Sequence, residues 1–172
     1  MTIHSSHPFA DPEPDPVRRF RGRLGGAVTL WTAGAEGTRA GLTVTSLMVA
    51  NGESPRILAL VDPDSDLRDA VRDSGACVIQ VLSWRDRALA EMFASTAPAP
   101  GGAFAHATWE QTSFGPRLVT ATTWAFGVPV EERSAGWSVE LICRLEEMHF
   151  RDETEAALGH RRGRFFPLGS GT

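Results

Sequence analysis

Residues 41–67 read GLTVTSLMVANGESPRILALVDPDSDL, and this stretch decides the fold. Two runs rich in β-branched and aliphatic residues, Gly41–Ala50 and Arg56–Val61, flank a turn that contains glycine and proline. Such runs on either side of a turn predict two β-strands. The second run leads through an acidic turn to Ser65, a favourable N-cap residue. We therefore predict a helix from Asp66 to Ser74.

Hydroxyl side chains gather on the first run, at Thr43, Thr45 and Ser46. Alternate side chains of a strand share a face, so Thr43 and Thr45 should point one way and Ser46 the other. The helix start after Ser65 offers free N–H groups and the positive end of a dipole, which favour a phosphate. Hydroxyls beside such a helix predict a pocket for a phosphorylated cofactor. The residues alone also fit an ordinary hairpin with polar side chains facing water and a routine helix cap.

The rest of the chain adds more strands and a few short helices. Further runs with strand character are Ala27–Thr32, Ala76–Leu82, Arg117–Val130, Trp137–Phe150 and Leu158–Leu168. The regular alternation of strands and helices that is typical of a doubly wound parallel sheet is not visible. Six to eight strands with short helices predict a mainly β fold, a closed antiparallel barrel with short peripheral helices.

The length of 172 residues fits one domain. Residues 1–16 contain four prolines and three acidic residues with few apolar ones, so we expect a flexible N-terminal arm. Residues 17–172 then form the domain. The segment Val17–Leu24 follows the arm, with three apolar residues on one helical face and four arginines on the rest. This segment is either a solvated basic helix or a helix whose arginine neutralises a bound phosphate of the same or a neighbouring subunit.

Composition excludes several partners. The formal net charge of −4 favours neither nucleic acid nor an anionic membrane surface. No apolar run is long enough to span a bilayer, and the N-terminus lacks the apolar core of a signal peptide. Cys77 and Cys143 fall inside predicted strands, where we expect buried free thiols in a reducing compartment. We therefore expect a cytoplasmic protein.

The chain shows little chemistry of its own. The sequence contains no Ser-His-Asp order, HExxH, P-loop or GxGxxG motif, and its five histidines have no metal-ligand spacing. We therefore predict no metal site. Because the sequence shows no such catalytic motif, we expect a cofactor that supplies the reactive group.

The stretch Gly41–Ser46, with Ser54-Pro55 and Val61–Ser65 after it, resembles the signature of the flavin reductase-like family, which has the FMN-binding split-barrel fold. Members carry a Gly-hydrophobic-Thr-x-x-Ser run, a proline at the start of a strand, and a turn that leads to a serine and a helix. Further segments resemble the family in the same order, and the resemblance covers roughly residues 18–168 (the further segments are Ala27–Thr32, Ala76–Leu82, Ala88–Ala94, Gly115–Leu118 and His160–Phe165).

The resemblance implies an NAD(P)H-dependent flavin reductase that reduces FMN, or FAD, with NAD(P)H as reductant. It also implies a homodimer and a monooxygenase partner that receives the reduced flavin. His160 would be the catalytic residue near the nicotinamide. The remaining site residues would bind the cofactor: Thr43, Val44, Thr45, Ser46, Asp62, Ser65, Phe93 and Arg164. Three acidic residues, Asp62, Asp64 and Asp66, would repel a phosphate there unless they point outward or pair with arginines.

Two other functions remain open at this point. One is a split-barrel protein that binds FMN or another cofactor, such as haem or a deazaflavin, without reducing free flavin. The other is a non-catalytic oligomer with an empty pocket. Yellow colour on purification would exclude the empty pocket, and NADH oxidation stimulated by added FMN would separate the reductase from the simple binder.

Overall fold

The structure is a computed structural model and describes residues 15–169. The predicted flexible arm lies outside this range, except for its last two residues. Asp15 is the N-cap of helix α1 (Pro16–Leu24), and Pro16 is its first residue. The other helices are α2 (Asp66–Ser74) and α3 (Arg87–Phe93), with the short 3-10 helices η1 (Trp84–Asp86) and η2 (Ala103–His106).

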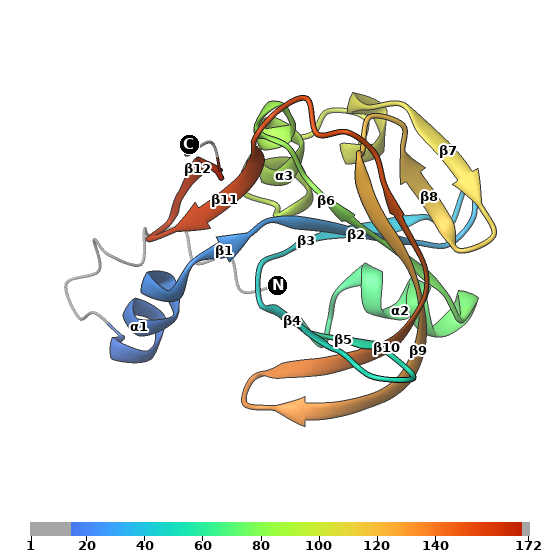
Figure 1. Ribbon diagram of the computed structural model, residues 1–172, viewed down its shortest axis with the longest axis horizontal. Coiled ribbons are helices and arrows are strands. Elements are labelled where there is room, and N and C mark those ends of the chain that lie inside the picture. Colours follow the sequence, from blue (N-terminus) through green and yellow to red (C-terminus); the bar gives the residue numbers. More distant parts are fainter. Residues whose placement is uncertain (1–14, 170–172) are drawn as a thin grey trace.

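Within residues 15–169, twelve strands contain far more residues than the helices do, so the predicted mainly β class is confirmed (Figure 1). Seven strands form one curled antiparallel sheet in the order β3-β2-β6-β9-β10-β5-β4. Their bounds are β2 (Thr29–Ala33), β3 (Ala40–Val44), β4 (Leu47–Ala50), β5 (Arg56–Val61), β6 (Cys77–Val81), β9 (Thr123–Ala135) and β10 (Ser138–Phe150).

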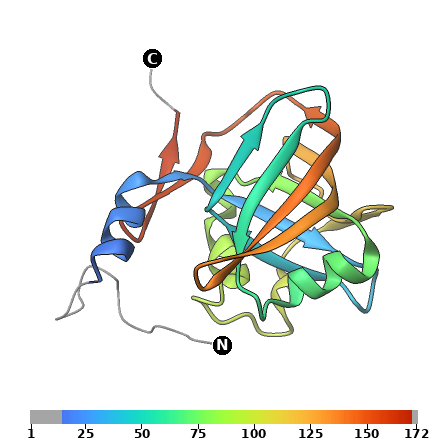
Figure 2. The same ribbon diagram turned by 90° about the horizontal axis from the view of Figure 1, so that it is seen from below.

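Two smaller sheets flank the large one. A three-stranded sheet contains β1 (Gly26–Ala27), β11 (Ala157–Arg161) and β12 (Arg164–Leu168) in the order β1-β11-β12. With α1 it forms a lobe that projects from the curled sheet (Figures 1 and 2). Backbone hydrogen bonds from Val28 to Leu158, from Leu82 to Val28 and from Leu158 to Leu82 tie this lobe to the large sheet. The second small sheet pairs β7 (Trp109–Thr112) with β8 (Gly115–Leu118).

The predicted closed barrel is wrong in one respect, because the sheet stays open between its two edge strands. These edges are β3 and β4, and no ladder joins them in residues 15–169. The run Gly41–Ala50, predicted as one strand, divides at Thr45-Ser46, where the chain crosses from one edge of the sheet to the other. Within the described residues, β3 pairs with β2 and β4 pairs with β5, so the two strands lie at opposite edges of the sheet although two residues separate them in the sequence. The sheet is a half-barrel with a split.

Two hydrophobic clusters lie on the two sides of the sheet. Trp31 of β2 belongs to the cluster inside the curl, with Ile57 of β5 and Leu141 of β10. Leu30, the residue before Trp31, belongs to the cluster between the sheet and α3. All five residues of β2 are buried because both faces of the strand are covered. The hydroxyls of its two threonines, Thr29 and Thr32, donate hydrogen bonds to the carbonyls of Val44 and Pro116.

The two cysteines meet inside the curl, and both are free and buried, as predicted. Their sulfur atoms are 3.9 Å apart, and they lie on β6 and β10, which flank β9 on either side. Gly127 of β9 makes this approach possible, because a Cβ atom there would lie 2.9 Å from the Cys77 sulfur. The hydrogen bond with Cys143, together with burial, raises the pKa of Cys77 well above its ordinary value.

Local sequence signals explain the helix that follows the split. Ser65 caps α2, and its hydroxyl oxygen accepts a hydrogen bond from the Arg68 backbone N–H at 3.4 Å. Gly75 ends the helix in the left-handed conformation, with φ of 69°. Both the helix bounds and the cap agree with the prediction. Within residues 15–169, no helix has the length and apolar character needed to cross a membrane.

Candidate functional site

Two cavities lie beside β3, one near each end of the strand. The first, called the α1 cavity here, has a volume of about 580 Å³ and includes Thr45 and Ser46, just after the strand ends. The second, called the α2 cavity, has a volume of about 510 Å³ and includes Ala40 and Gly41, where the strand begins. Both volumes lie in the range of small-molecule pockets. The side chains around each cavity therefore decide which one suits a nucleotide.

Helix α1 brings positive charge to the α1 cavity. Asp15 starts the helix by accepting a hydrogen bond from the Val17 backbone N–H at 2.9 Å, and Gly25 ends it with φ of 64°. Arg18 and Arg21 both line the cavity, because residues three apart in a helix share a face. The predicted basic helix therefore places two of its four arginines beside the cavity.

The hairpin β11–β12 fixes the position of α1. The backbone N–H of Arg162 donates to the carbonyl of Gly22 at 2.8 Å, and Arg161 Nε donates to the carbonyl of Arg23 at 3.0 Å. Gly25 fits against the same strand, since a Cβ atom there would lie 3.2 Å from the carbonyl oxygen of His160. Residues more than 130 positions apart in the sequence thus form one wall.

His160 lies on β11, pairs with Phe165 across the hairpin, and lines the α1 cavity. Its ring is half-buried, and its centroid is 5.2 Å from that of Phe165 in an edge-on arrangement. Burial lowers the pKa of His160 below its ordinary value, and the positive charge of Arg21 lowers it further. The imidazole is therefore neutral at neutral pH and can donate or accept a hydrogen bond.

The opposite wall of the α1 cavity is mostly apolar. Leu58 and Leu60 line the cavity from the outer face of β5, while Ile57, Ala59 and Val61 of the same strand are buried in the core. Glu140 of β10 is the acidic residue among those that line the cavity, and its carboxylate pairs with Arg133. An apolar wall, two hydroxyls and two arginines match a ring system that carries a phosphate.

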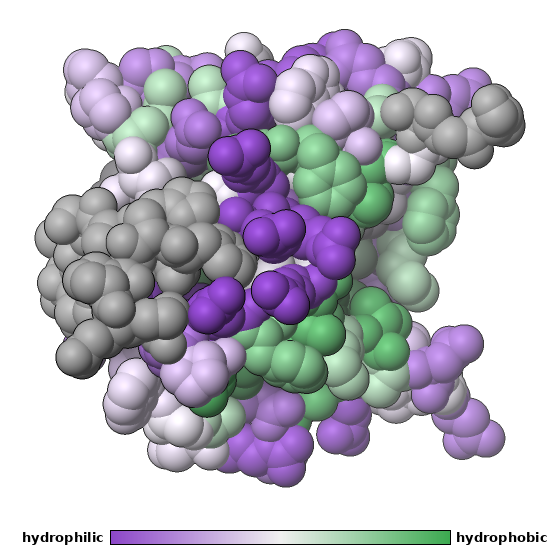
Figure 3. Space-filling view, turned by 90° about the vertical axis from the view of Figure 1, so that its left-hand side faces the viewer, coloured by the Kyte–Doolittle hydropathy of each residue, from purple (hydrophilic) through white to green (hydrophobic). Residues whose placement is uncertain are grey.

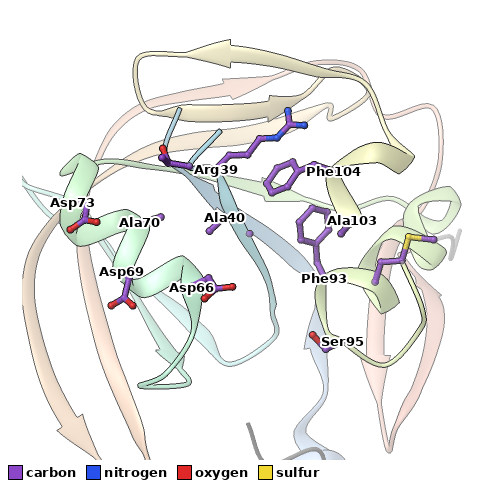
Figure 4. A pocket seen from close by; sticks show the side chains of 13 residues that line it. Arg39, Ala40, Asp66, Asp69, Ala70, Asp73, Phe93, Ser95, Ala103 and Phe104 are labelled. Atoms are coloured by element: carbon purple, nitrogen blue, oxygen red, sulfur yellow. The ribbon is translucent and has the colours of Figure 1, made fainter. Parts of the chain in front are cut away.

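The α2 cavity has the opposite electrostatic character (Figure 4). Asp66, Asp69 and Asp73 face it from α2, at the three- and four-residue spacing of one helical face. Phe93, Phe104 and Arg39 face it from the other side, and the guanidinium carbon of Arg39 lies 4.6 Å from the centre of the Phe104 ring. Three carboxylates against one arginine disfavour a phosphate, so the α1 cavity is the candidate site.

The structure brings three predicted site residues together. Thr45, Ser46 and His160 all line the α1 cavity, although they come from the split in the large sheet and from the small sheet. Phe93 lines the α2 cavity instead, where it packs over Gly41. Arg164 is exposed on β12 and lies outside both sets of lining residues, while its neighbour Gly163 belongs to the α1 cavity.

Four other predicted residues lie outside both cavities. The Thr43 hydroxyl donates to the carbonyl of Ala90 at 2.8 Å and so holds α3 against β3, and Val44 is part of the core. The Ser65 hydroxyl donates to the carbonyl of Asp62 at 2.8 Å, and the Asp62 carboxylate accepts from the Asp64 N–H at 2.9 Å. These side-chain contacts shape the fold around the site.

Sequence reasoning missed the apolar wall formed by Leu58 and Leu60. A signal for it exists in the run Arg56–Val61, where residues on both faces of the strand are apolar. A strand with two apolar faces is covered on both sides, so the outer leucines indicate a partner or a ligand.

A family comparison decides the identity of the fold. The family model for the flavin reductase like domain matches residues 21–169. The chain belongs to this family. The match spans all three strands of the projecting lobe and all seven strands of the half-barrel, so every residue that lines the α1 cavity except Arg18 lies within the matched range.

Curated relatives are also similar in sequence. The chain is 29% identical to "FMN reductase (NADH) RutF 2" of Methylorubrum extorquens over 143 residues, which is 81% of this chain and 83% of that relative. It is 29% identical to "FMN reductase (NADH) RutF" of Ancylobacter novellus over 104 residues, which is 60% of this chain and 57% of that relative.

Solved structures share the fold. NADH:FAD oxidoreductase SgcE6 of Streptomyces globisporus C-1027 superposes with a TM-score of 0.79 at 19% identity, covering 94% of this chain and 99% of that one. BorF, the flavin reductase component of a bacterial two-component tryptophan halogenase, gives a TM-score of 0.78 at 21% identity, covering 90% and 98%. At these identities the likeness concerns the fold alone.

Residues 15–169 hold no group of three or more His, Cys, Asp or Glu side chains arranged for a metal ion.

Proposed function

We propose that this chain is an NAD(P)H-dependent flavin reductase that reduces FMN, or FAD, in the α1 cavity. Family membership supports the reaction class, and the names of the curated relatives make FMN and NADH the first substrates to test. The observation that carries the choice of cavity is charge. Arg18 and Arg21 line the α1 cavity, whereas three aspartates line the α2 cavity.

The α1 cavity fits a flavin by size and by chemistry. A volume of about 580 Å³ suits a drug-sized ligand, and Leu58 and Leu60 offer an apolar surface for a flat ring system. The hydroxyls of Thr45 and Ser46 can hydrogen-bond to the polar edge of such a ring. A flavin held there would supply the redox chemistry, because its ring system can take up a hydride from a nicotinamide.

The residues around the α1 cavity would bind the flavin and orient the nicotinamide. Arg18 and Arg21 neutralise phosphate charge at the α1 side of the cavity, where charge-assisted hydrogen bonds are strong. His160, neutral at neutral pH, positions the nicotinamide by a hydrogen bond and does not add another positive charge. The cofactor contacts predicted from the sequence for Thr43, Val44, Asp62, Ser65, Phe93 and Arg164 stay predictions that substitution tests, and a flavin in the α1 cavity does not require them because none of the six lines it.

The deciding experiment measures the bound flavin and the rate of NADH oxidation on the same purified protein. The absorbance spectrum of the purified chain shows whether flavin is bound, and NADH oxidation is then followed with and without added FMN. Oxidation that rises with free FMN supports the reductase. Tight flavin or haem absorbance without NADH oxidation favours the cofactor-binding alternative, and a colourless protein that neither binds FMN nor oxidises NADH contradicts the proposal.

The biological setting is part of the proposal. We propose a cytoplasmic homodimer, because free cysteines suit a reducing compartment and much apolar surface is exposed. We also propose that the reduced flavin is passed to a partner monooxygenase. Structural neighbours that are components of two-component systems support this last step, among them BorF and a nitrilotriacetate monooxygenase component B from Mycobacterium thermoresistibile.

A further inference from the structure

Glu140 brings a negative charge to a cavity whose other ionisable lining residues are basic. Figure 3 shows the face of the molecule on the side of α1 and the β11–β12 hairpin, where hydrophilic and hydrophobic residues lie next to each other. The α1 cavity takes Arg18, Arg21 and His160 from this lobe and Glu140 from the half-barrel. No other carboxylate is among the described residues that line it. The charge of Glu140 therefore acts on a ligand in the opposite sense to that of the arginines.

The strand register places Glu140 beside the apolar wall of the cavity. Glu140 of β10 pairs with Leu60 of β5 on one side and with Arg133 of β9 on the other. Directly paired residues share a face of the sheet, with their Cβ atoms about 4.5–5.5 Å apart. The carboxylate thus neighbours a leucine that lines the cavity. A flat ring that lies on Leu58 and Leu60 also lies beside this carboxylate.

Arg133 holds the Glu140 side chain and offsets part of its charge. The Nε atom of Arg133 donates a hydrogen bond to Oε2 of Glu140. The side chain of Glu140 is 19% exposed, whereas that of Arg133 is 57% exposed and lies outside the cavity lining. The arginine charge is therefore screened by water more than the carboxylate charge is. Because the carboxylate is the member of the pair that lines the cavity, the pair presents negative charge to a ligand.

Reduction changes the charge of a flavin ring but not that of its phosphate. In the proposed reaction a C–H bond of the dihydronicotinamide breaks, and the hydrogen moves with both electrons to N5 of the ring. The nicotinamide becomes its oxidised cation, and the ring, neutral before, carries one negative charge. Arg18 and Arg21 attract the phosphate in both redox states. A carboxylate beside the ring repels the reduced state alone.

We infer that Glu140 makes the α1 cavity hold reduced flavin less tightly than oxidised flavin, and so favours release of the product. The inference rests on the proposed reduction of flavin in this cavity and names the residue that separates the two redox states. A reductase that passes its reduced flavin to another enzyme needs this difference, because a product bound more tightly than the substrate would stay in the site. The arginines supply affinity, and Glu140 supplies the preference between substrate and product.

Equilibrium titration in the absence of oxygen tests the inference, with oxidised FMN and with FMN reduced by dithionite. Low salt and mildly alkaline pH keep the charges unscreened and the reduced ring ionised. Glu140→Gln keeps the side-chain shape and removes the charge. We expect the dissociation constant of reduced FMN to fall about tenfold and that of oxidised FMN to change by less than about twofold. The midpoint potential of bound FMN should then rise by about 30 mV, the equivalent of tenfold for a two-electron couple.

Arg133→Gln is a second variant for which we expect the opposite sign. It removes the positive charge that offsets Glu140, so the dissociation constant of reduced FMN should rise about threefold and the midpoint potential should fall. A general loss of packing does not move the two partners of one ion pair in opposite directions. Glu146→Gln is the matched control, because Glu146 lies on the same strand, pairs with Arg144 at 2.6 Å and lies outside both cavities. It should leave both dissociation constants unchanged.

Three results separate this inference from the proposed function. If Glu140→Gln changes the affinity for oxidised and reduced FMN equally, or if Glu146→Gln gives the same shift, the inference is overturned, and a chain that oxidises NADH when FMN is added keeps its proposed function. If the shifts have the expected signs but the unaltered chain does not oxidise NADH, the inference holds and the reductase is contradicted. A chain that binds FMN in neither redox state overturns both.

Discussion

The two cavities lie near opposite ends of β3 and have similar volumes, but the side chains that line them carry opposite charge. The α1 cavity takes Arg18 and Arg21 from a helix that precedes the barrel, whereas the α2 cavity takes three aspartates from a helix packed inside the fold. A flavin and a nicotinamide nucleotide are both phosphorylated anions, so charge separates two pockets that size alone leaves equal. The small lobe thus supplies the arginines of the α1 cavity, whereas the half-barrel contributes Glu140 and apolar side chains to its lining.

The largest expected effect comes from His160 in the α1 cavity. His160→Ala should slow reduction of bound flavin by NADH about tenfold to a thousandfold, the range of positioning and acid–base roles. Flavin content should stay close to that of the unchanged protein. Stopped-flow absorbance and the flavin-to-protein ratio measure the two quantities. His106→Ala is the control, since His106 bonds to the carbonyl of Pro100 outside both cavities. If neither quantity moves, His160 has no part in the site.

The next prediction concerns FMN affinity and compares variants that remove charge from each of the two cavities. Arg18→Gln with Arg21→Gln should weaken FMN binding about tenfold or more, because a hydrogen bond to a charged group contributes about 1.5–3 kcal/mol. Asp69→Asn with Asp73→Asn removes two charges from the α2 cavity and should leave FMN affinity within about twofold. Equilibrium titration at low salt measures both. A greater loss in the aspartate variant would move the site to the α2 cavity.

A smaller effect separates capping from cofactor binding at Ser65. Its hydroxyl is engaged by the cap of α2 and by the carbonyl of Asp62. Ser65→Ala should therefore lower the free energy of unfolding by about 1 kcal/mol, the usual cost of a lost N-cap. Denaturant unfolding measures this loss, and FMN titration of the same variant should give an unchanged dissociation constant. Weaker FMN binding without loss of stability would instead place the phosphate at the start of α2.

The smallest effect is a shift in pH dependence. Arg21→Gln removes a positive charge that helps to lower the pKa of His160, so the pKa of His160 should rise toward its ordinary value. The acidic limb of the activity profile should move to higher pH, and NMR titration of the imidazole should show the same direction.

The pH dependence of the free energy of unfolding provides a second test of the lowered pKa of His160. Because the folded-state pKa of His160 is lowered, the unfolded chain takes up the proton first as pH falls. Its contribution to the free energy of unfolding is therefore lost as pH falls below the ordinary histidine value of about 6.5. A contribution that grew with acid would contradict the lowered pKa.

Local signals predicted the bounds of α2, but they missed breaks within strand-like runs and pairing between distant segments. The runs Arg117–Val130 and Leu158–Leu168, each predicted as one strand, both contain parts of two strands. Ser65 and Gly75 mark the ends of α2 in the sequence, and the structure places that helix at the predicted residues. The division of Gly41–Ala50 had no local signal, because Thr45 is β-branched and suits a strand. Its cause lies elsewhere, in the opposite positions of β3 and β4 in the sheet.

The site shows the same limit. Alternation placed Thr43 and Thr45 on one face, but the strand ends at Val44 and only Thr45 reaches the α1 cavity. The Thr43 hydroxyl instead bonds to Ala90, 47 residues later. The aspartates of the α2 cavity were visible as one helical face, whereas the wall built from α1 and β11 joins residues that no local pattern connects.

The strand order also governs when the chain can fold as it is synthesised. β5 pairs with β4, its neighbour in sequence, and with β10, which is made about eighty residues later. Until β10 emerges, Ile57, Ala59 and Val61 lack the strand that completes their side of the core. Closing such a long loop is slow compared with forming a hairpin. The half-barrel is therefore a late product of synthesis, and a nascent chain that stops before β10 displays an apolar strand with one unpaired edge.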